Sequence, residues 1–247
     1  MLKALFLDMD DTLCDTQQAN REATQKLVTA FQQRYGKTAA AEQLAKDYVK
    51  GIYREWTSDQ EEKYTELLKE CSEEHYRIVL IQDIVKDAGL GDIDSAQALQ
   101  LQNKFDQDRL DSFRFFPGIK EFLIEARKYF TLVVITNGPE YSQLPKLAAV
   151  QMEEYVDHIL VGGQEPEQKP AASIFFKALG LAGCEAHEVV HVGDNLAADI
   201  QGAHNSGITS VWIQHQQPLD AELGIDPHHT VLHPSEIPEL IKQLHPY

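Results

Sequence analysis

The chain has 247 residues, 43% of them hydrophobic, which is enough for one large α/β core with or without a smaller insert. Its formal net charge of −17 argues against a general nucleic-acid binder, because affinity for phosphate backbones depends on clustered lysine and arginine. A small anionic substrate is compatible with this charge if the site supplies its own cation.

The cysteines and the N-terminus indicate a compartment. Cys14, Cys71 and Cys184 are far apart and form no Cys-x-x-Cys pair, which favours reduced thiols in a cytosolic protein. The first apolar run is interrupted by Lys3 and ends at Asp8, so it is too short for a signal peptide or a membrane span. We therefore expect a cytoplasmic protein with no membrane or nucleic-acid partner, as a monomer or homodimer.

The first predicted strand covers residues 2–7, an apolar run typical of a strand buried on both faces. It ends at Asp8-Met9-Asp10-Asp11-Thr12. Asp8 and Asp10 can point the same way, because side chains alternate between the two faces of a strand. Carboxylates beside a core favour a bound cation or a reaction. A polar turn or a helix N-cap explains the same residues, and the pentapeptide alone leaves both interpretations open.

Residues 15–113 contain no convincing strand and instead repeat apolar residues four apart, as helices do. Two such stripes are Ala23, Leu27, Phe31 and Tyr35, and Tyr76, Leu80, Ile84 and Ala88. A further helix is predicted over residues 95–113, before a turn at residues 116–118. We interpret residues 15–113 as an all-helical domain inserted after the first strand.

After the turn, short apolar or β-branched runs alternate with helical segments. The predicted strands cover residues 132–135, 158–161, 189–192 and 210–213, and the helices cover residues 141–150, 170–179 and 197–205. This alternation predicts a doubly wound, mostly parallel, Rossmann-like α/β sheet, which the first strand must join. The predicted core therefore comprises residues 1–14 and 114–247.

Polar residues follow these strands where parallel sheets bind ligands, at the carboxyl ends. The segments are Thr136-Asn137-Gly138, Lys169-Pro170, and Gly193-Asp194-Asn195 with Asp199 on the following helix. Pro170 is expected to start a helix and to hold Lys169 extended just outside it. Each segment alone is ordinary turn or cap chemistry, but four of them at successive strand ends indicate a reactive site.

Together with residues 8–12, these segments resemble, in order, the four motifs of the haloacid dehalogenase-like hydrolase superfamily. The helical insert occupies the place of that family's type 1 cap. The resemblance implies that Asp8 is a nucleophile that forms an aspartyl-phosphate. It also implies that Asp10 protonates the leaving group and then deprotonates water, a role that suits a carboxyl group kept from ionising fully by its acidic neighbours.

The resemblance further implies a Mg²⁺ cofactor, which fits oxygen ligands better than zinc does. Its implied ligands are Asp8, Asp194 and the backbone carbonyl of Asp10, with Asp199 orienting metal-bound water or Lys169. The implied phosphate-binding residues are Thr136, Asn137, Gly138 and Lys169. Phosphoryl transfer needs such positioning and charge neutralisation above all.

The same resemblance separates reaction types and suggests a substrate. The dehalogenase branch lacks the second aspartate, so Asp10 favours phosphate over carbon–halogen chemistry. Residues 161–175, 199–202 and 211–213 are similar to the N-acylneuraminate-9-phosphatase branch, whose substrate carries a carboxylate. Arg21 and Arg54 are therefore candidates to bind it. A nucleoside 5′-monophosphatase, a broad sugar phosphatase and a phosphomutase stay open, whereas a non-catalytic regulator is disfavoured because the core motifs are complete.

Four histidines near the C-terminus, His215, His228, His229 and His233, lack the spacing of a metal site, so we interpret them as solvated loop residues. Cys14 lies close to Asp8, and its acidic surroundings predict a raised pKa and an unreactive thiol.

Overall fold

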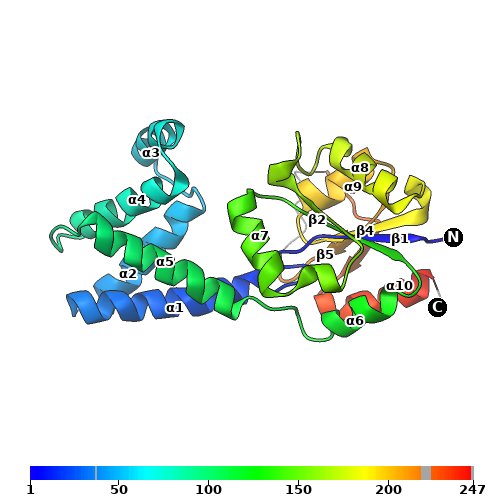
Figure 1. The fold of residues 1–247 in the computed structure, drawn as a ribbon, viewed down its shortest axis with the longest axis horizontal. Helices are drawn as coiled ribbons and strands as arrows, with labels where there is room; N and C mark the ends of the chain where they lie inside the picture. Colours follow the sequence, from blue (N-terminus) through cyan, green and yellow to red (C-terminus); the bar gives the residue numbers. More distant parts are fainter. Residues whose placement is uncertain (37, 218–223, 246–247) are drawn as a thin grey trace. The chain divides into compact units, whose positions relative to one another are not determined.

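The computed structural model describes residues 1–36, 38–217 and 224–245. The chain divides into two compact units (Figure 1). The core unit comprises Met1–Gln17 and Phe113–Tyr247, and the helical unit comprises Gln18–Ser112. Within the described ranges, none of the helices combines the length and the apolar character that a membrane span needs.

In its described part, the core unit is built on six parallel strands in the order β3-β2-β1-β4-β5-β6. The strands are β1 (Ala4–Leu7), β2 (Thr131–Thr136), β3 (His158–Val161), β4 (Val189–Gly193), β5 (Thr209–Ile213) and β6 (His229–Val231). All four residues of β1 are buried, as expected for a central strand covered on both faces. The predicted doubly wound parallel sheet is confirmed.

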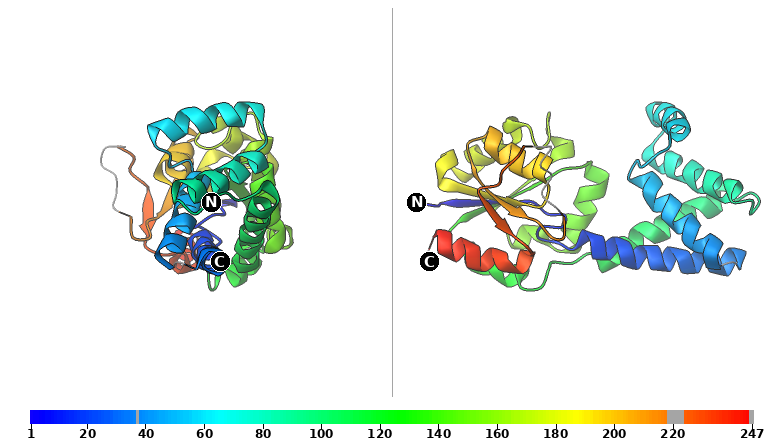
Figure 2. Two further views of the ribbon diagram at one scale, coloured as in Figure 1. Left: turned by 90° about the vertical axis from the view of Figure 1, so that its left-hand side faces the viewer. Right: turned by 180° about the vertical axis from the view of Figure 1, so that it is seen from behind.

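Helices cover both faces of this sheet (Figures 1 and 2). One face packs against α8 and α9, and the other lies beside α6 and α10. The helices of the core unit are α6 (Ile119–Ala126), α7 (Glu140–Ala149), α8 (Ala172–Ala182), α9 (Gln201–Asn205) and α10 (Ile237–Leu244). Short helical turns add η1 (Met152–Glu154), η2 (Gly162–Gln164), η3 (Ala186–Glu188), η4 (Leu196–Ile200) and η5 (Pro234–Glu236). Apolar residues that alternate along β1, such as Phe6, meet Phe175 of α8 on one face.

The sequence-based description misses α6 and α10, and three further details of it are wrong. The helix expected to start at Pro170 begins at Ala172, because Ala171 stays extended and acts as the N-cap. The helix expected over residues 197–205 is two elements, since η4 is a π-helix that precedes α9. His229 lies in β6, an edge strand of three residues that is too short to show a period.

The helical unit contains α1 (Thr16–Tyr35), whose first two residues belong to the core unit, and α2 (Thr38–Ile52), α3 (Ser58–Glu70), α4 (Glu73–Asp87) and α5 (Ser95–Ser112). Its centre is a cluster of buried side chains rich in aromatic rings. The Thr57 side chain caps α3 and Ser72 caps α4, by accepting bonds from the backbone N–H of Gln60 and His75. The role of this unit as a cap stays a prediction.

Candidate active site

The candidate site lies at the carboxyl ends of β1, β2 and β4. In the sheet register, Leu7 of β1 is opposite Val134 of β2 and Val192 of β4. Asp8 follows directly, and its backbone N–H donates to the Val192 carbonyl at 2.9 Å. The sheet therefore brings the first, second and fourth polar segments to one edge.

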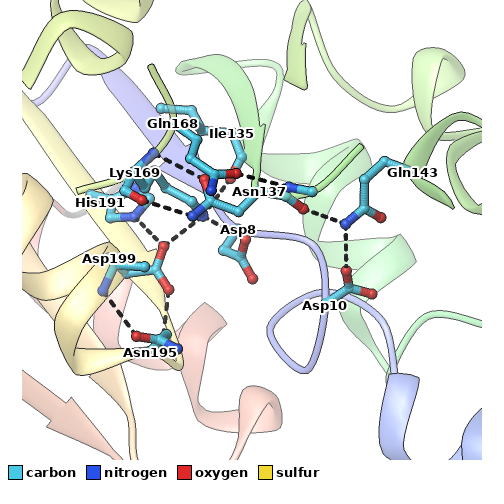
Figure 3. A network of polar contacts seen from close by, with 12 residues as sticks. Asp8, Asp10, Ile135, Asn137, Gln143, Gln168, Lys169, His191, Asn195 and Asp199 are labelled. Carbon is cyan, nitrogen blue, oxygen red and sulfur yellow. Dashed lines mark hydrogen bonds and ion pairs between the residues drawn. The ribbon is translucent and has the colours of Figure 1, made fainter. Parts of the chain in front are cut away.

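Lys169 is the centre of the buried charges in this site (Figure 3). Its side chain is 1% exposed, and Nζ donates to Asp8 Oδ1 at 2.6 Å, to Asp199 Oδ1 at 2.7 Å and to the Ile135 carbonyl at 2.6 Å. An ammonium has three donors, so each is used. Lys169 thereby fixes the orientation of the Asp8 carboxylate.

Asn137 holds the backbone of Lys169 from the neighbouring strand end. Its Nδ2 donates to the Lys169 carbonyl at 2.8 Å, and its Oδ1 accepts from the Lys169 N–H at 3.0 Å. The N–H of Gly138 is engaged too, because it donates to Gln168 Oε1 at 3.3 Å. Asn137 therefore positions Lys169 through its side chain, a function that its place after β2 did not predict.

Thr136 ends β2 with a buried hydroxyl. The residue is 1% exposed, and Oγ1 has no hydrogen-bond partner within the described part of the chain. A buried hydroxyl without a partner costs about 1–3 kcal/mol, so native proteins seldom keep one without a use. This group can donate to a bound anion at the strand end.

Three carboxylates form a second cluster at this edge. Asp8, Asp194 and Asp199 each offer an oxygen, and these oxygens lie within 4.8 Å of one another. Burial and mutual repulsion raise the pKa of Asp8 to about 7 and that of Asp194 to about 9. A divalent cation relieves this repulsion, so the donor set fits a hard, oxygen-seeking ion such as Mg²⁺.

Asp199 differs from the other two carboxylates because both of its oxygens are already bonded. Oδ1 accepts from Lys169 and lies 3.0 Å from Nε2 of the buried His191, and Oδ2 accepts from the Asn195 N–H at 3.1 Å. Burial alone would raise its pKa, but Lys169 and His191 lower the pKa of Asp199 to about 2. Asp199 is thus a fixed anion that orients Lys169, which leaves Asp8 and Asp194 as the side chains best placed to hold a metal.

Asp10 has polar partners other than those of Asp8, and it faces Gln143 (Figure 3). Lys146 Nζ lies 3.0 Å from Oδ1 and 2.9 Å from Oδ2, Thr16 Oγ1 donates to Oδ1 at 2.5 Å, and Gln143 Nε2 donates to Oδ2 at 3.1 Å. Burial would raise the pKa of Asp10, but Lys146 and these donors lower it below its ordinary value. The expectation that acidic neighbours keep Asp10 from ionising fully is therefore wrong.

Lys146, Gln143, Thr16 and His191 were not among the residues that the sequence singled out. Gln143 and Lys146 are three apart in the helix predicted over residues 141–150, so a shared face was foreseeable. Nothing in the sequence indicates that this face meets Asp10, because the contact depends on how α7 packs beside β1.

The two candidate substrate-binding arginines lie in the helical unit. Arg54 donates to Glu73 at 2.7 Å, and its guanidinium lies 5.1 Å from the ring centroid of Trp56 and 5.0 Å from that of Tyr76. Arg21 donates to Oε1 of Gln18, one turn earlier in α1. Their part in substrate binding stays a prediction.

Hydrogen bonds join the side chains of two C-terminal histidines to distant parts of the chain. Nε2 of His215 lies 2.6 Å from the Asp11 carbonyl, and Nδ1 of His228 accepts from the Ser210 N–H at 3.2 Å. His228 is exposed and lies in a bend, as expected of a solvated loop residue, whereas His215 is only partly exposed and departs from that expectation. Cys14 is buried, and burial followed by the charges of Asp10 and Asp8 raises its thiol pKa well above the ordinary value, as predicted.

Comparisons with known proteins identify a family for the chain. The family model of haloacid dehalogenase-like hydrolases matches residues 2–207. The chain is 28% identical to N-acylneuraminate-9-phosphatase from Rattus norvegicus over 98% of this chain and 95% of that protein. It is 27% identical to glyceraldehyde 3-phosphate phosphatase from Pyrococcus abyssi, over 87% of this chain and 82% of that protein. The solved structure of the HAD-hydrolase YfnB from Bacillus subtilis shares the fold, with a TM-score of 0.69 at 20% identity over 97% of this chain and 98% of that one.

Proposed function

The chain belongs to the haloacid dehalogenase-like hydrolase family and is a phosphatase of that family, and on that premise we propose that it hydrolyses a small phosphomonoester through a covalent phosphate on Asp8. The observation that carries the proposal is the Asp8 carboxylate itself. One oxygen is fixed by Lys169, and Oδ2 accepts no hydrogen bond from any described residue. A carboxylate held in this way offers one oxygen for attack on phosphorus.

The phosphoryl oxygens would be bound by groups around Asp8. The Lys169 ammonium supplies positive charge, and the Thr136 hydroxyl is a buried donor with no competing partner among the described residues. The Asn137 N–H is a third candidate at the same strand end. Such preorganised donors are the main source of rate enhancement in phosphoryl transfer.

Asp8 and Asp194 would hold Mg²⁺ together with the Asp10 backbone carbonyl, and Asp199 would keep Lys169 in place. Bound there, the ion would neutralise charge on a phosphate that otherwise meets several carboxylates. The raised pKa values of Asp8 and Asp194 support this assignment, because the charge of Lys169 does not offset burial and the neighbouring carboxylates.

Asp10 would move the protons of both steps. Bonding of Asp8 to phosphorus breaks the bond to the leaving alkoxide, which takes a proton from Asp10. Water then attacks the aspartyl-phosphate, gives its proton to Asp10, and releases phosphate and the free Asp8 carboxylate. The lowered pKa of Asp10 suits the base of the second step, and the proton that Asp10 takes from water in that step is the one that it gives to the next leaving group.

For the substrate, we propose N-acylneuraminate 9-phosphate, which is the substrate that the name of the 28% identical rat relative implies. Support also comes from the length of that match, which spans nearly the whole of both proteins. Glyceraldehyde 3-phosphate is a second candidate because the Pyrococcus abyssi relative is named for it. A nucleoside 5′-monophosphatase, a broad sugar phosphatase and a phosphomutase share the core chemistry and are tested beside it.

One set of measurements tests the mechanism. Asp8→Asn should abolish phosphate release and phosphate incorporation into the protein, and excess EDTA should abolish release by the unmodified enzyme; turnover in either case refutes the covalent, metal-assisted mechanism.

A second set tests the substrate. The panel contains sialic acid 9-phosphate, glyceraldehyde 3-phosphate, nucleoside monophosphates and hexose phosphates, with 2-chloropropionate to detect dehalogenation. Equal rates across the panel refute the specific assignment, and a need for a bisphosphorylated sugar favours the mutase.

A further inference from the structure

The core unit carries two lysine–aspartate pairs at one sheet edge. Lys169 binds Asp8, and Lys146 binds Asp10. The first pair belongs to the nucleophile, but the proposed mechanism gives Lys146 no task. Lys146 is nonetheless 8% exposed, and burying a lysine side chain costs conformational entropy as well as hydration. Its position is therefore maintained for a reason other than solubility.

Lys146 contacts Asp10 in a two-point geometry. Nζ lies 3.0 Å and 2.9 Å from the two carboxylate oxygens, so both are held by one ammonium. Thr16 and Gln143 each add a further donor to one oxygen. A carboxylate with this many charge-assisted and neutral bonds has its side-chain rotation fixed.

Gln143 connects this anchor to the rest of the site. Its Nε2 donates both to Asp10 Oδ2 and to the backbone carbonyl of Asn137. The Asn137 side chain in turn holds the backbone of Lys169, whose ammonium holds Asp8. One run of hydrogen bonds therefore joins the two aspartates (Figure 3).

The chain leaves little room for Gln143 to move. Residue 138 is a glycine with φ of +114°, and a Cβ there would lie 2.8 Å from Nε2 of Gln143. The side-chain amide of Gln143 therefore fits only because residue 138, in the turn between β2 and α7, has no side chain. Gln143 is itself 4% exposed, so solvent does not compete for its two donors.

From these contacts we propose that Lys146 and Gln143 of α7 are positioning residues, which hold the Asp10 carboxylate in register with Asp8 for proton transfer. This inference rests on the proposed function, because it requires Asp10 to be the proton carrier. Lys146 and Gln143 would fix the position of the Asp10 carboxylate. This matters because general acid–base catalysis is effective only when the proton carrier lies within hydrogen-bond reach of the reacting oxygen.

The test compares two kinds of leaving group in Lys146→Met, which keeps the aliphatic stem and removes the donor. p-Nitrophenolate departs without a proton, so formation of the aspartyl-phosphate should stay fast and its hydrolysis should slow. We expect a burst of about one p-nitrophenolate per enzyme, followed by a steady state about 10²-fold slower than the unmodified enzyme. KM should fall together with kcat, so that kcat/KM, which reports the first step, stays within about threefold. With an alkyl phosphate, both steps need Asp10, so no burst is expected.

A steady-state rate within about threefold of the unmodified enzyme overturns the inference. Loss of the burst together with the steady state also overturns it, since Lys146 would then act on Asp8 or on the fold. Gln143→Leu is the second variant, and we expect the same burst pattern with a loss of about tenfold. Lys177→Met is the matched control, because Lys177 pairs with Glu165 at 2.6 Å on the surface of the same unit; its rates should be unchanged.

A double-mutant cycle separates positioning from general damage. If Lys146 acts through Asp10, adding Lys146→Met to Asp10→Asn should cost no more than about twofold beyond Asp10→Asn alone. A further loss of about tenfold or more shows an independent role and refutes the inference. Turnover in Asp8→Asn would instead refute the proposed function, so the two failures are distinguishable.

Discussion

Each unit of the molecule buries a basic side chain, and the two differ in how their charges balance. In the helical unit, Arg77 donates to both oxygens of Asp106 at 2.7 and 2.8 Å and to the Tyr48 hydroxyl. One cation there meets one carboxylate, which is 37% exposed. In the core unit, one Lys169 faces the carboxylates of Asp8 and Asp199, with Asp194 beside them.

This difference distinguishes structural from functional charge. In a balanced, partly solvated pair such as Arg77–Asp106, the hydrogen-bond donors and acceptors are satisfied and no additional cation or ligand is needed. An excess of buried carboxylates is stable only when another cation or a reaction compensates it, which is why perturbed pKa values gather at functional sites. Buried charge alone is therefore weak evidence for a site, and unbalanced buried charge is stronger.

The largest expected effect comes from replacing each of the two buried basic side chains by methionine. Lys169→Met should lower kcat/KM by about 10³-fold, because it removes the charge that faces the phosphate and frees Asp8. Arg77→Met should leave activity per folded molecule within about twofold and lower Tm by about 5 °C, because it leaves Tyr48 and Asp106 without their donor. Steady-state kinetics and thermal melts of the two variants measure kcat/KM and Tm for each.

The comparison between the units fails if Arg77→Met lowers kcat/KM as much as Lys169→Met does. It fails equally if Lys169→Met only changes Tm.

The next effect concerns Thr136, where activity and stability should move apart. Thr136→Val removes the buried Oγ1 that has no described partner, so we expect kcat/KM to fall about 10²-fold while Tm stays equal or rises by about 2 °C. Kinetics and calorimetry on the same preparation measure both. Thr131→Val, the same substitution at the opposite end of β2, should change neither by much. A drop in Tm without a drop in kcat/KM would show that the hydroxyl is structural.

How well the sequence predicted each part depends on where its signal comes from. Strands such as β1 and β4 are buried on both faces, so each is an unbroken apolar run that stands out from the helices. The parallel order then places the polar segments at one edge, and this follows from topology alone. β6 was missed because three residues at a sheet edge carry no period.

The partners within the site could not be predicted in the same way. That Lys169 meets Asp8 follows from the resemblance, but that Lys146 meets Asp10 depends on the angle at which α7 leaves β2. His191 is a similar case, because its place in β4 predicts burial and not a contact with Asp199. Periodicity predicts which face a residue occupies, whereas a hydrogen bond requires the separation between elements.

The excess of buried carboxylates should make the stability of the metal-free protein depend on pH. The pKa values of Asp8 and Asp194 are raised to about 7 and about 9, so these groups bind more protons in the folded chain than in the unfolded chain between about pH 4 and pH 9. The stability of the metal-free protein should therefore fall between about pH 5 and pH 9. The lowered pKa values of Asp199 and His191 act in the opposite sense. The contribution of Asp199 is fully present above about pH 5 and that of His191 above about pH 7, so the fall should be clearest from about pH 7 to pH 9.

Because Mg²⁺ favours the ionised carboxylates, its stabilising effect should grow across the same range. We expect the difference in Tm between Mg²⁺ and EDTA to be about 5 °C larger at pH 8.5 than at pH 5.5. Thermal melts at matched ionic strength measure it. In Asp194→Asn most of that difference should vanish, and a difference that is the same at both pH values would contradict the charge argument.

The smallest expected effect separates the two arginines of the helical unit. Arg54 is engaged by Glu73 and by the faces of Trp56 and Tyr76, so Arg54→Met should lower Tm by about 2–4 °C and leave KM nearly unchanged. Arg21 is the other candidate for the substrate carboxylate, which a guanidinium binds through two parallel N–H bonds. Arg21→Met should then raise KM about tenfold for sialic acid 9-phosphate and leave KM for an uncharged sugar's phosphate unchanged. An equal rise for both substrates would mean that Arg21 acts on the phosphate or on the fold, and a rise confined to Arg54→Met would reverse the assignment of the two residues.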